Sequence, residues 1–192
     1  MEHWLIVWNE FKKGSEAAFE SLYYRYVDAL FRYGSKISSN DELVKDSIQQ
    51  LFLELYSSKE RLAVPDNPEF YLLKSLKRII IHKLTKSNLN IEYQSNLLPA
   101  FEIEIDPEEK LVSSEREDSR IKLLSKILDS LPSDKKELLY LKFYSGLNNQ
   151  QIGEMIGQKS ATVQKQIIRI LKKLQVNFLD QFLELFTLCF RA

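Results

Sequence analysis

Helical periodicity restricts the folds open to this chain of 192 residues. Apolar side chains recur every three or four positions through Ser15–Gly34, Asp41–Tyr56 and Glu69–Lys86. Glycine and proline are scarce, with 5 of each, and convincing strand alternation is absent. The sequence therefore predicts an all-α protein.

The first two predicted helices each bury one face, with Ser15 and Asn40 as their expected N-caps. The stripe predicted to be buried on the first helix is Phe19, Leu22, Tyr23, Tyr26 and Leu30. The corresponding stripe on the second helix is Val44, Ile48, Leu51 and Leu55, with Phe52 at its edge.

The opposite face of the second helix is mixed in character. It carries Glu42, Asp46, Gln49 and Leu53, with Tyr56 nearby. An exposed leucine beside an aromatic ring, surrounded by acidic and amide groups, suits the docking of a partner helix. The alternative is a solvated face, because single exposed leucines are common.

The third predicted helix is apolar around most of its circumference, so it must be deeply buried. Its remaining polar wedge consists of Tyr71, Lys74, Ser75, Arg78, His82, Thr85 and Lys86. Cations interleaved with an aromatic ring suit a single nucleic-acid strand, whose phosphates pair with the charges while an unstacked base meets the ring. The alternative is a charged edge that keeps a central helix soluble.

A change of composition divides the chain into two helical domains. Residues 88–118 lack sustained periodicity, and they include Pro99, Pro107 and an excess of acidic side chains. We therefore expect one domain over 1–87, an acidic linker over 88–118, a second domain over 119–176 and an apolar tail over 177–192. Within the second domain the helix is expected to pause at Leu131 and Pro132, with Ser133 as the next cap.

The segment from Gly153 to Leu174 predicts a helix-turn-helix. Gly153 allows close helix packing, and Gly157 can close the turn with a positive φ. Ser160 is the expected cap of the second helix. That helix has an apolar stripe of Val163, Ile167, Ile170, Leu171 and Leu174. Its other side carries Thr162, Lys165, Gln166, Arg169, Lys172 and Lys173. The pattern is typical of a recognition helix that meets duplex DNA, and the alternative is an ordinary helical hairpin with a solvated basic face.

Charge and cysteine content exclude several classes of protein. The net charge of zero conceals two positive segments, Lys74–Lys86 and Lys159–Lys173. A single cysteine, Cys189, permits no internal disulfide and favours a reducing cytoplasm. We find no signal peptide or membrane span in the sequence. With two histidines and no glycine-rich phosphate loop, we expect no catalytic residues, metal, cofactor or small-molecule substrate.

In their order and spacing, these segments resemble the extracytoplasmic-function group of bacterial sigma factors, the compact members of the sigma-70 family. DSIQQLFLELY resembles the helix of that family that binds core RNA polymerase, and FYLLKSLKRIIIHKL resembles the following helix, which helps to melt the promoter. The stretch from LDSLPSDKKELL to IIRILKKL resembles the minus-thirty-five-binding domain. The resemblance implies a sigma2-like helical bundle followed by a sigma4-like helix-turn-helix.

The resemblance also implies partners and contact residues. Those facing the clamp helices of the largest polymerase subunit would be Asp46, Gln49, Phe52 and Leu53. Those meeting the single-stranded minus-ten element would be Tyr71, Lys74, Arg78 and His82. Those along the minus-thirty-five element would be Ser160, Thr162, Lys165, Gln166 and Arg169. The implied partners are core RNA polymerase, promoter DNA and an anti-sigma factor, which can be membrane-anchored.

The chain departs from the family pattern at several of these positions. Arg78 and His82 stand where the family usually has Asn and Asp, so the melted strand can be read differently here. Gln50 replaces a usual acid, and Gln164, Lys165 and Gln166 replace a common Lys-Ser-Arg run. The base preference of relatives therefore does not transfer to this chain.

Two questions remain open from the sequence. A transcriptional regulator or interaction module that acts without polymerase would keep the helix-turn-helix, but it would need neither the Asp46, Gln49 and Leu53 face nor the polar wedge. The apolar tail over 177–192 either packs on its own domain or docks to another chain, an anti-sigma factor or a second copy.

Overall fold

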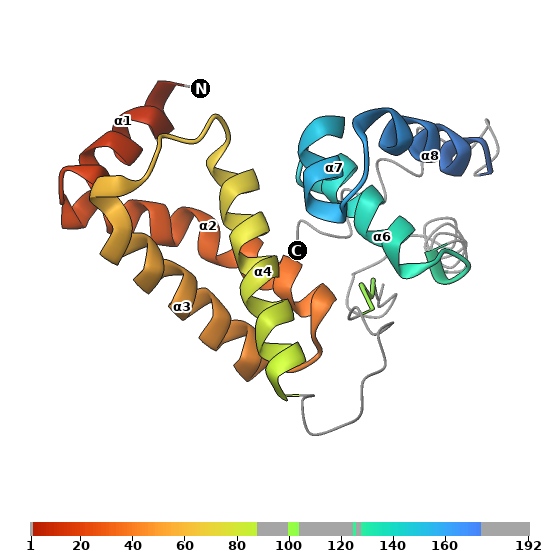
Figure 1. The fold of residues 1–192 in the computed structure, drawn as a ribbon, viewed down its shortest axis with the longest axis horizontal. Helices are drawn as coiled ribbons and strands as arrows, with labels where there is room; N and C mark the ends of the chain where they lie inside the picture. The colour runs from red at the N-terminus through yellow and green to blue at the C-terminus, as the bar shows by residue number, and fades with distance from the viewer. Residues whose placement is uncertain (1, 88–99, 104–124, 126–127, 174–192) are drawn as a thin grey trace, which may run out of the picture. The chain divides into compact units, whose positions relative to one another are not determined.

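The computed structural model divides the chain into two units, Met1–Ala100 and Phe101–Ala192. It describes residues 2–87, 100–103, 125 and 128–173. The regular elements within these ranges are all helical, as Figure 1 shows, so the all-α prediction is confirmed. The apolar tail and most of the predicted acidic linker lie outside the described residues.

Unit 1 is built from four α-helices and one short 3₁₀ turn. The elements are α1 (Glu2–Lys12), α2 (Glu16–Ile37), α3 (Asp41–Ser58), the turn η1 (Lys59–Arg61) and α4 (Pro68–Ser87). Helices α2, α3 and α4 pack against one another, and α1 packs against α2 (Figure 1). The three helices predicted here are therefore confirmed, whereas α1 was not predicted.

Side-chain caps define where the helices of unit 1 begin. The Ser15 hydroxyl accepts a hydrogen bond from the Ala18 amide at 3.3 Å, and Asn40 Oδ1 accepts one from the Leu43 amide at 3.0 Å. Both caps were predicted. Asn67 Oδ1 accepts from the Phe70 amide at 3.0 Å and so caps α4 in the same way.

The core of unit 1 includes contributions from α1 as well as from the three longer helices. Trp8 and Phe11 are fully buried, and a Cβ at Gly34 would lie only 2.6 Å from Val44 Cγ1, so glycine lets α2 and α3 approach closely. Tyr23, predicted to be buried, is instead 37% exposed, because its ring stands at the edge of the contact between α2 and α3. The predicted burial of α4 is confirmed by Leu72, Leu73, Leu76, Ile79 and Ile80.

Glu69, near the start of α4, makes the stability of unit 1 depend on pH. Burial raises the pKa of its carboxyl group above the ordinary value, and the positive charges of Arg25 and Arg32 lower it in part. The folded state therefore binds this proton more tightly than the unfolded state does. The stability contributed by Glu69 is present below the unfolded pKa of about 4.3 and is lost as the pH rises through the raised, folded-state pKa.

Glu69→Gln is expected to remove this dependence. Relative to the native protein, the variant should gain free energy of unfolding as the pH rises through the window above about 4.3. Urea unfolding of both proteins across a pH series measures the difference, and Glu20→Gln, at an exposed position of α2, controls for the loss of one negative charge. If the gain in the free energy of unfolding of Glu69→Gln over the native protein became smaller as the pH rises, the raised pKa of Glu69 would be contradicted.

Unit 2 contains α6 (Ser133–Leu139), a π-helical turn η3 (Tyr140–Tyr144), α7 (Asn149–Ile156) and α8 (Ser160–Lys173). Asn148 caps α7 through a reciprocal capping box with Gln151. Gly157 has a φ of 68°, as predicted for the residue that closes the turn between α7 and α8. Helices α7 and α8 pack together, and α6 packs against both.

Two predictions for this unit need correction. Ser133 is the first residue of α6 and makes no capping bond, because its hydroxyl bonds the backbone of Phe101 instead. Phe101 and Ile103 fall inside the predicted linker, yet both are buried in unit 2. Their apolar side chains favour this burial over the extended, solvated state expected of a linker.

Candidate protein and nucleic-acid interfaces

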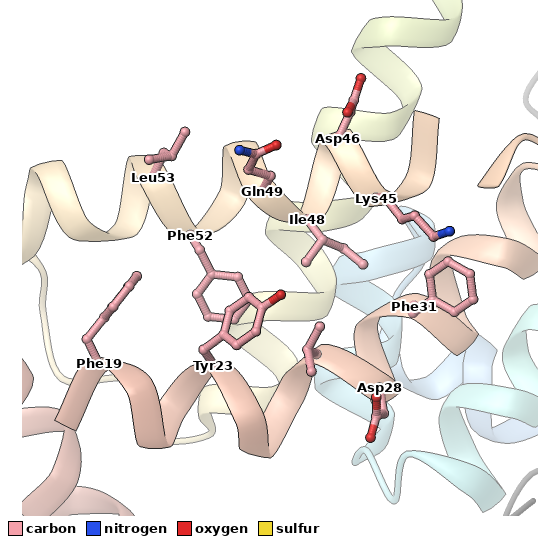
Figure 2. Close-up of a pocket in the computed structure, with 11 residues that line it drawn as sticks. Phe19, Tyr23, Asp28, Phe31, Lys45, Asp46, Ile48, Gln49, Phe52 and Leu53 are labelled. Atoms are coloured by element: carbon pink, nitrogen blue, oxygen red, sulfur yellow. The ribbon is translucent and has the colours of Figure 1, made fainter. Parts of the chain in front are cut away.

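A groove of about 680 Å³ lies between α2 and α3. The side chains that line it are Phe19, Tyr23, Val27, Asp28 and Phe31 from α2, and Lys45, Asp46, Ile48, Gln49, Phe52 and Leu53 from α3. The set includes all four residues that the sequence assigned to polymerase binding. Figure 2 shows aromatic rings from both helices filling the space between them. The groove is thus apolar in its depth and polar along its edges.

Phe52 forms the floor of this groove. Its ring centroid lies 4.9 Å from that of Tyr23 and 6.0 Å from that of Phe19, and the side chain is only 3% exposed. The expectation that Phe52 itself faces the polymerase therefore needs correction. Its ring forms the bottom of the groove, because packing against two aromatic neighbours is more favourable in free energy than exposure to water.

The remaining predicted residues form an exposed edge along α3. Leu53 is 63% exposed, and Asp46 and Gln49 are exposed too. Figure 2 shows Gln49 and Leu53 pointing away from α2, as their helical spacing predicted. At one end of the groove Lys45 Nζ lies 5.8 Å from the ring centroid of Phe31, where it adds a cation close to Asp46 along the helix.

The sequence analysis did not predict that α2 forms the second wall of the groove. Phe19, Tyr23, Val27 and Phe31 recur every fourth residue, which places them on one stripe of α2. Two of them had been assigned to the core. Because this stripe is offset from the buried one through Leu22 and Tyr26, the spacing contained a signal for a second apolar face.

The polar wedge of α4 is exposed at Lys74, Arg78 and His82. The Arg78 guanidinium lies 3.9 Å from Glu54 Oε2 of α3, and Lys74 Nζ lies 5.3 Å from the ring centroid of Phe70. An exposed ion pair of this length contributes little to stability, so Arg78 can exchange its carboxylate for a phosphate at small cost.

Tyr71 differs from the other members of the wedge. It is half-buried, and its ring meets the edge of Trp8 at 5.9 Å and 86°. The ring therefore packs against α1, whereas the sequence prediction had it available to an unstacked base. The reason is that α1, which was not predicted, covers this end of α4.

The outward face of α8 is polar and basic. Ser160, Thr162, Lys165 and Arg169 are exposed, while Val163, Ile167 and Ile170 are buried against the rest of unit 2. This two-sided arrangement confirms the predicted helix. Ile168, which the sequence analysis did not single out, is 45% exposed between these polar residues.

Two details of α8 differ from the prediction. The carbonyl oxygen of Lys159 accepts hydrogen bonds from the amides of Thr162 and Val163 at 2.8 and 3.1 Å, so Lys159 occupies the cap position and Ser160 is the first helical residue. Gln166 is half-buried. Its Nε2 donates to Gln158 Oε1 at 2.8 Å, and its Oε1 accepts from Lys135 Nζ at 3.0 Å. These bonds hold the Gln166 side chain against the turn and α6.

The described residues contain neither a group of metal ligands nor a membrane-spanning helix. Within them, His, Cys, Asp and Glu side chains form no group of three that could hold a metal ion. Among the helices in the described ranges, none has the length and apolar character that a membrane span requires.

Comparisons with known proteins agree with this geometry. Residues 121–174 match the family model described as Sigma-70, region 4. Among solved structures the chain is similar to CnrH, solved in complex with the cytosolic domain of CnrY, with a TM-score of 0.54 and 16% sequence identity. This match covers 91% of the present chain and 96% of CnrH, and at that identity it shows the fold. No curated protein sequence matches the chain. The helix-turn-helix segment is therefore similar to sigma-70 region 4, and the chain shares the fold of CnrH along most of its length.

Proposed function

We propose that this protein is a sigma factor of the extracytoplasmic-function type, which directs core RNA polymerase to specific promoters. The observation that carries the proposal is that one chain combines a region 4 helix-turn-helix with an exposed Asp46, Gln49 and Leu53 edge beside an aromatic groove. A regulator that acts without polymerase would use only the first of these features. The protein acts by binding, in the cytoplasm, where polymerase and promoters are found.

Unit 1 holds the polymerase and the opened strand. Docking of a polymerase helix on the α3 edge buries Leu53, while Asp46 and Gln49 supply polar contacts at its margin. On α4, Lys74, Arg78 and His82 lie along one exposed side where they can follow the phosphates of a single strand. Holding a base out of its stack costs a few kcal/mol, which these contacts must offset.

Unit 2 holds the duplex upstream. Lys165 and Arg169 on the outward face of α8 contact phosphates and set the register of the helix in the major groove. Thr162, near the start of the helix, is placed to meet base edges. Gln166 is held by Gln158 and Lys135, so its amide approaches DNA in one preset orientation.

An inhibitory protein is the expected regulator of this activity. CnrH, which shares the fold, was solved with the cytosolic domain of a second protein, CnrY. By analogy, we propose that an anti-sigma factor binds the present chain and competes with the polymerase. The aromatic groove between α2 and α3 offers an apolar surface for such a competitor.

One experiment tests the proposed function directly. The purified protein is added to core polymerase with genomic DNA, and the 5′ ends of the transcripts are sequenced. We expect initiation at a limited set of sites that share two upstream sequence elements. Initiation no different from that of core polymerase alone would contradict the proposal. Duplex binding without polymerase-dependent initiation would favour the simple regulator.

Arg169→Ala is expected to weaken binding to the upstream element several-fold and to flatten its salt dependence. Each phosphate contact contributes about one counterion, so the slope of log K against log salt should become less negative by about one. Binding titrations at several salt concentrations measure the slope. Gln164→Ala, a neutral change on the same helix, should leave it unchanged, and an unaltered slope for Arg169→Ala would contradict the phosphate contact.

A further inference from the structure

The short segment Phe101–Ile103 is bound to unit 2 through its side chains. Phe101 and Ile103 are each only 3% exposed. The ring centroids of Phe101 and Tyr140 lie 5.5 Å apart at an interplanar angle of 62°, an edge-on aromatic contact. Two side chains of one tripeptide are thus inserted into the core of the region 4 unit, although the family match begins only at residue 121.

Polar contacts fix the backbone of the same segment. The hydroxyl of Ser133 accepts a hydrogen bond from the Phe101 amide and donates one to the Phe101 carbonyl oxygen at 3.3 Å. Glu102 Oε2 lies 2.9 Å from Lys136 Nζ, and the Lys136 side chain is only 9% exposed. A buried ammonium group needs an anionic partner, and Glu102 supplies it. We call Phe101–Ile103 the docking segment.

Docking of this segment shortens the stretch of chain that connects the two units and so limits the distance between them. From Ser87, the last residue of α4, to Phe101, a fully extended chain spans at most about 50 Å. If the segment were not docked, the connection would run on to residue 121, where the region 4 match begins, and could span roughly 120 Å. The docking segment therefore shortens the maximum reach between the units more than twofold.

We infer that the docking segment sets the range of spacings between the two promoter elements that this protein accepts. This inference rests on the proposed function for its effect on transcription. Because a tether that just spans two sites gives the highest effective concentration, promoters with longer spacers are disfavoured. Phe101, Ile103, Ser133 and Lys136 are then determinants of promoter specificity that contact no DNA.

Two insertions of the same length can show whether the docking segment is bound to unit 2. An eight-residue Gly-Ser insertion between Ser95 and Asn96 lengthens the chain before the docking segment, and the same insertion between Ser113 and Ser114 lengthens it afterwards. Neither changes a residue of the docking contact. In the free protein, dyes at Ser57→Cys and Gln150→Cys in a Cys189→Ser background report the distance between the units by energy transfer.

The mean distance is expected to grow with the first insertion and to stay unchanged with the second. Equal effects of the two insertions would overturn the inference, because the whole of residues 88–120 would then act as the tether. The double variant Phe101→Ala with Ile103→Ala should lengthen the distance as the first insertion does. If the double variant unfolds unit 2, the two insertions alone test the inference.

Transcription from the strongest start site mapped as above tests the effect on specificity. With four base pairs added to its spacer, we expect the native protein to lose about tenfold in transcript yield and the first insertion to restore most of it. The second insertion should behave as the native protein does. If the first insertion lengthens the distance but leaves the spacer preference unaltered, the inference fails. Failure of the proposed function is a separate result, namely no initiation by the native protein at any spacer, while the distance measurement needs no polymerase.

Discussion

Leu53→Asp is expected to abolish binding to core RNA polymerase while leaving the fold of unit 1 intact. Leu53 is 63% exposed on α3, so a carboxylate there is solvated in the free protein and should change its stability little. On docking, the same carboxylate would be buried in an apolar contact without a partner. That penalty is about 3 kcal/mol or more, which corresponds to at least a 100-fold loss of affinity.

The measurement is a titration of labelled protein with core polymerase, accompanied by a thermal unfolding curve for each variant. Ile6→Asp is the matched control, because Ile6 is 61% exposed on α1 and lies outside the groove between α2 and α3. It adds the same charge to a similarly exposed apolar position and should leave binding within about twofold, the ordinary effect of a change remote from an interface. Normal binding by Leu53→Asp would rule out the α3 edge as the polymerase-binding surface.

Gly153→Ala is expected to disrupt the turn between α7 and α8. A Cβ at this position would lie 2.4 Å from the carbonyl oxygen of Gln158, and the Gln158 amide already donates to the Gly153 carbonyl at 2.8 Å. The backbone must therefore shift to admit a methyl group. We expect unit 2 to lose about 2–4 kcal/mol of stability and the protein to lose duplex binding, since the turn orients α8.

Gly157→Ala, in the same turn, is the informative comparison. Gly157 has a φ of 68°, but a Cβ there would meet nothing within 4 Å, so only conformational strain of about 1 kcal/mol is expected. Amide hydrogen exchange in α7 and α8 measures both variants locally, without requiring the two units to unfold together. A larger loss of protection for Gly157→Ala than for Gly153→Ala would contradict the packing argument.

Much of the fold followed from local pattern. Ser15 and Asn40 cap α2 and α3 as predicted, because capping needs only a side-chain oxygen and an amide three residues away. The exposure of Asp46, Gln49 and Leu53 followed in the same way from helical spacing. Local rules failed for Ser133, which has the chemistry of a cap but is bound by a segment far away along the chain.

The candidate sites were predicted less completely than the helices. Helical spacing indicated the α3 edge but not the α2 side of the groove. The family resemblance implied that Phe52 faces the polymerase, whereas its ring forms the floor of the groove. Tyr71 and Gln166 were expected to meet DNA as free side chains, but Tyr71 packs against Trp8, and Gln166 is held in one orientation by its bonds to Gln158 and Lys135. In each case the partner comes from another element, so no window along the chain contains it.

The sequence by itself determined that this protein is helical, where α2, α3 and α4 lie, and which faces of α3 and α8 meet water. These properties depend on hydrogen bonds and side-chain spacing within a few residues, which the order of amino acids specifies directly. Only the tertiary structure decided that α2 and α3 enclose an aromatic groove and that Phe101–Ile103 belongs to unit 2. Both depend on apolar burial between segments distant in the chain, and burial is non-directional, so the partners of a side chain are known only once the helices have packed.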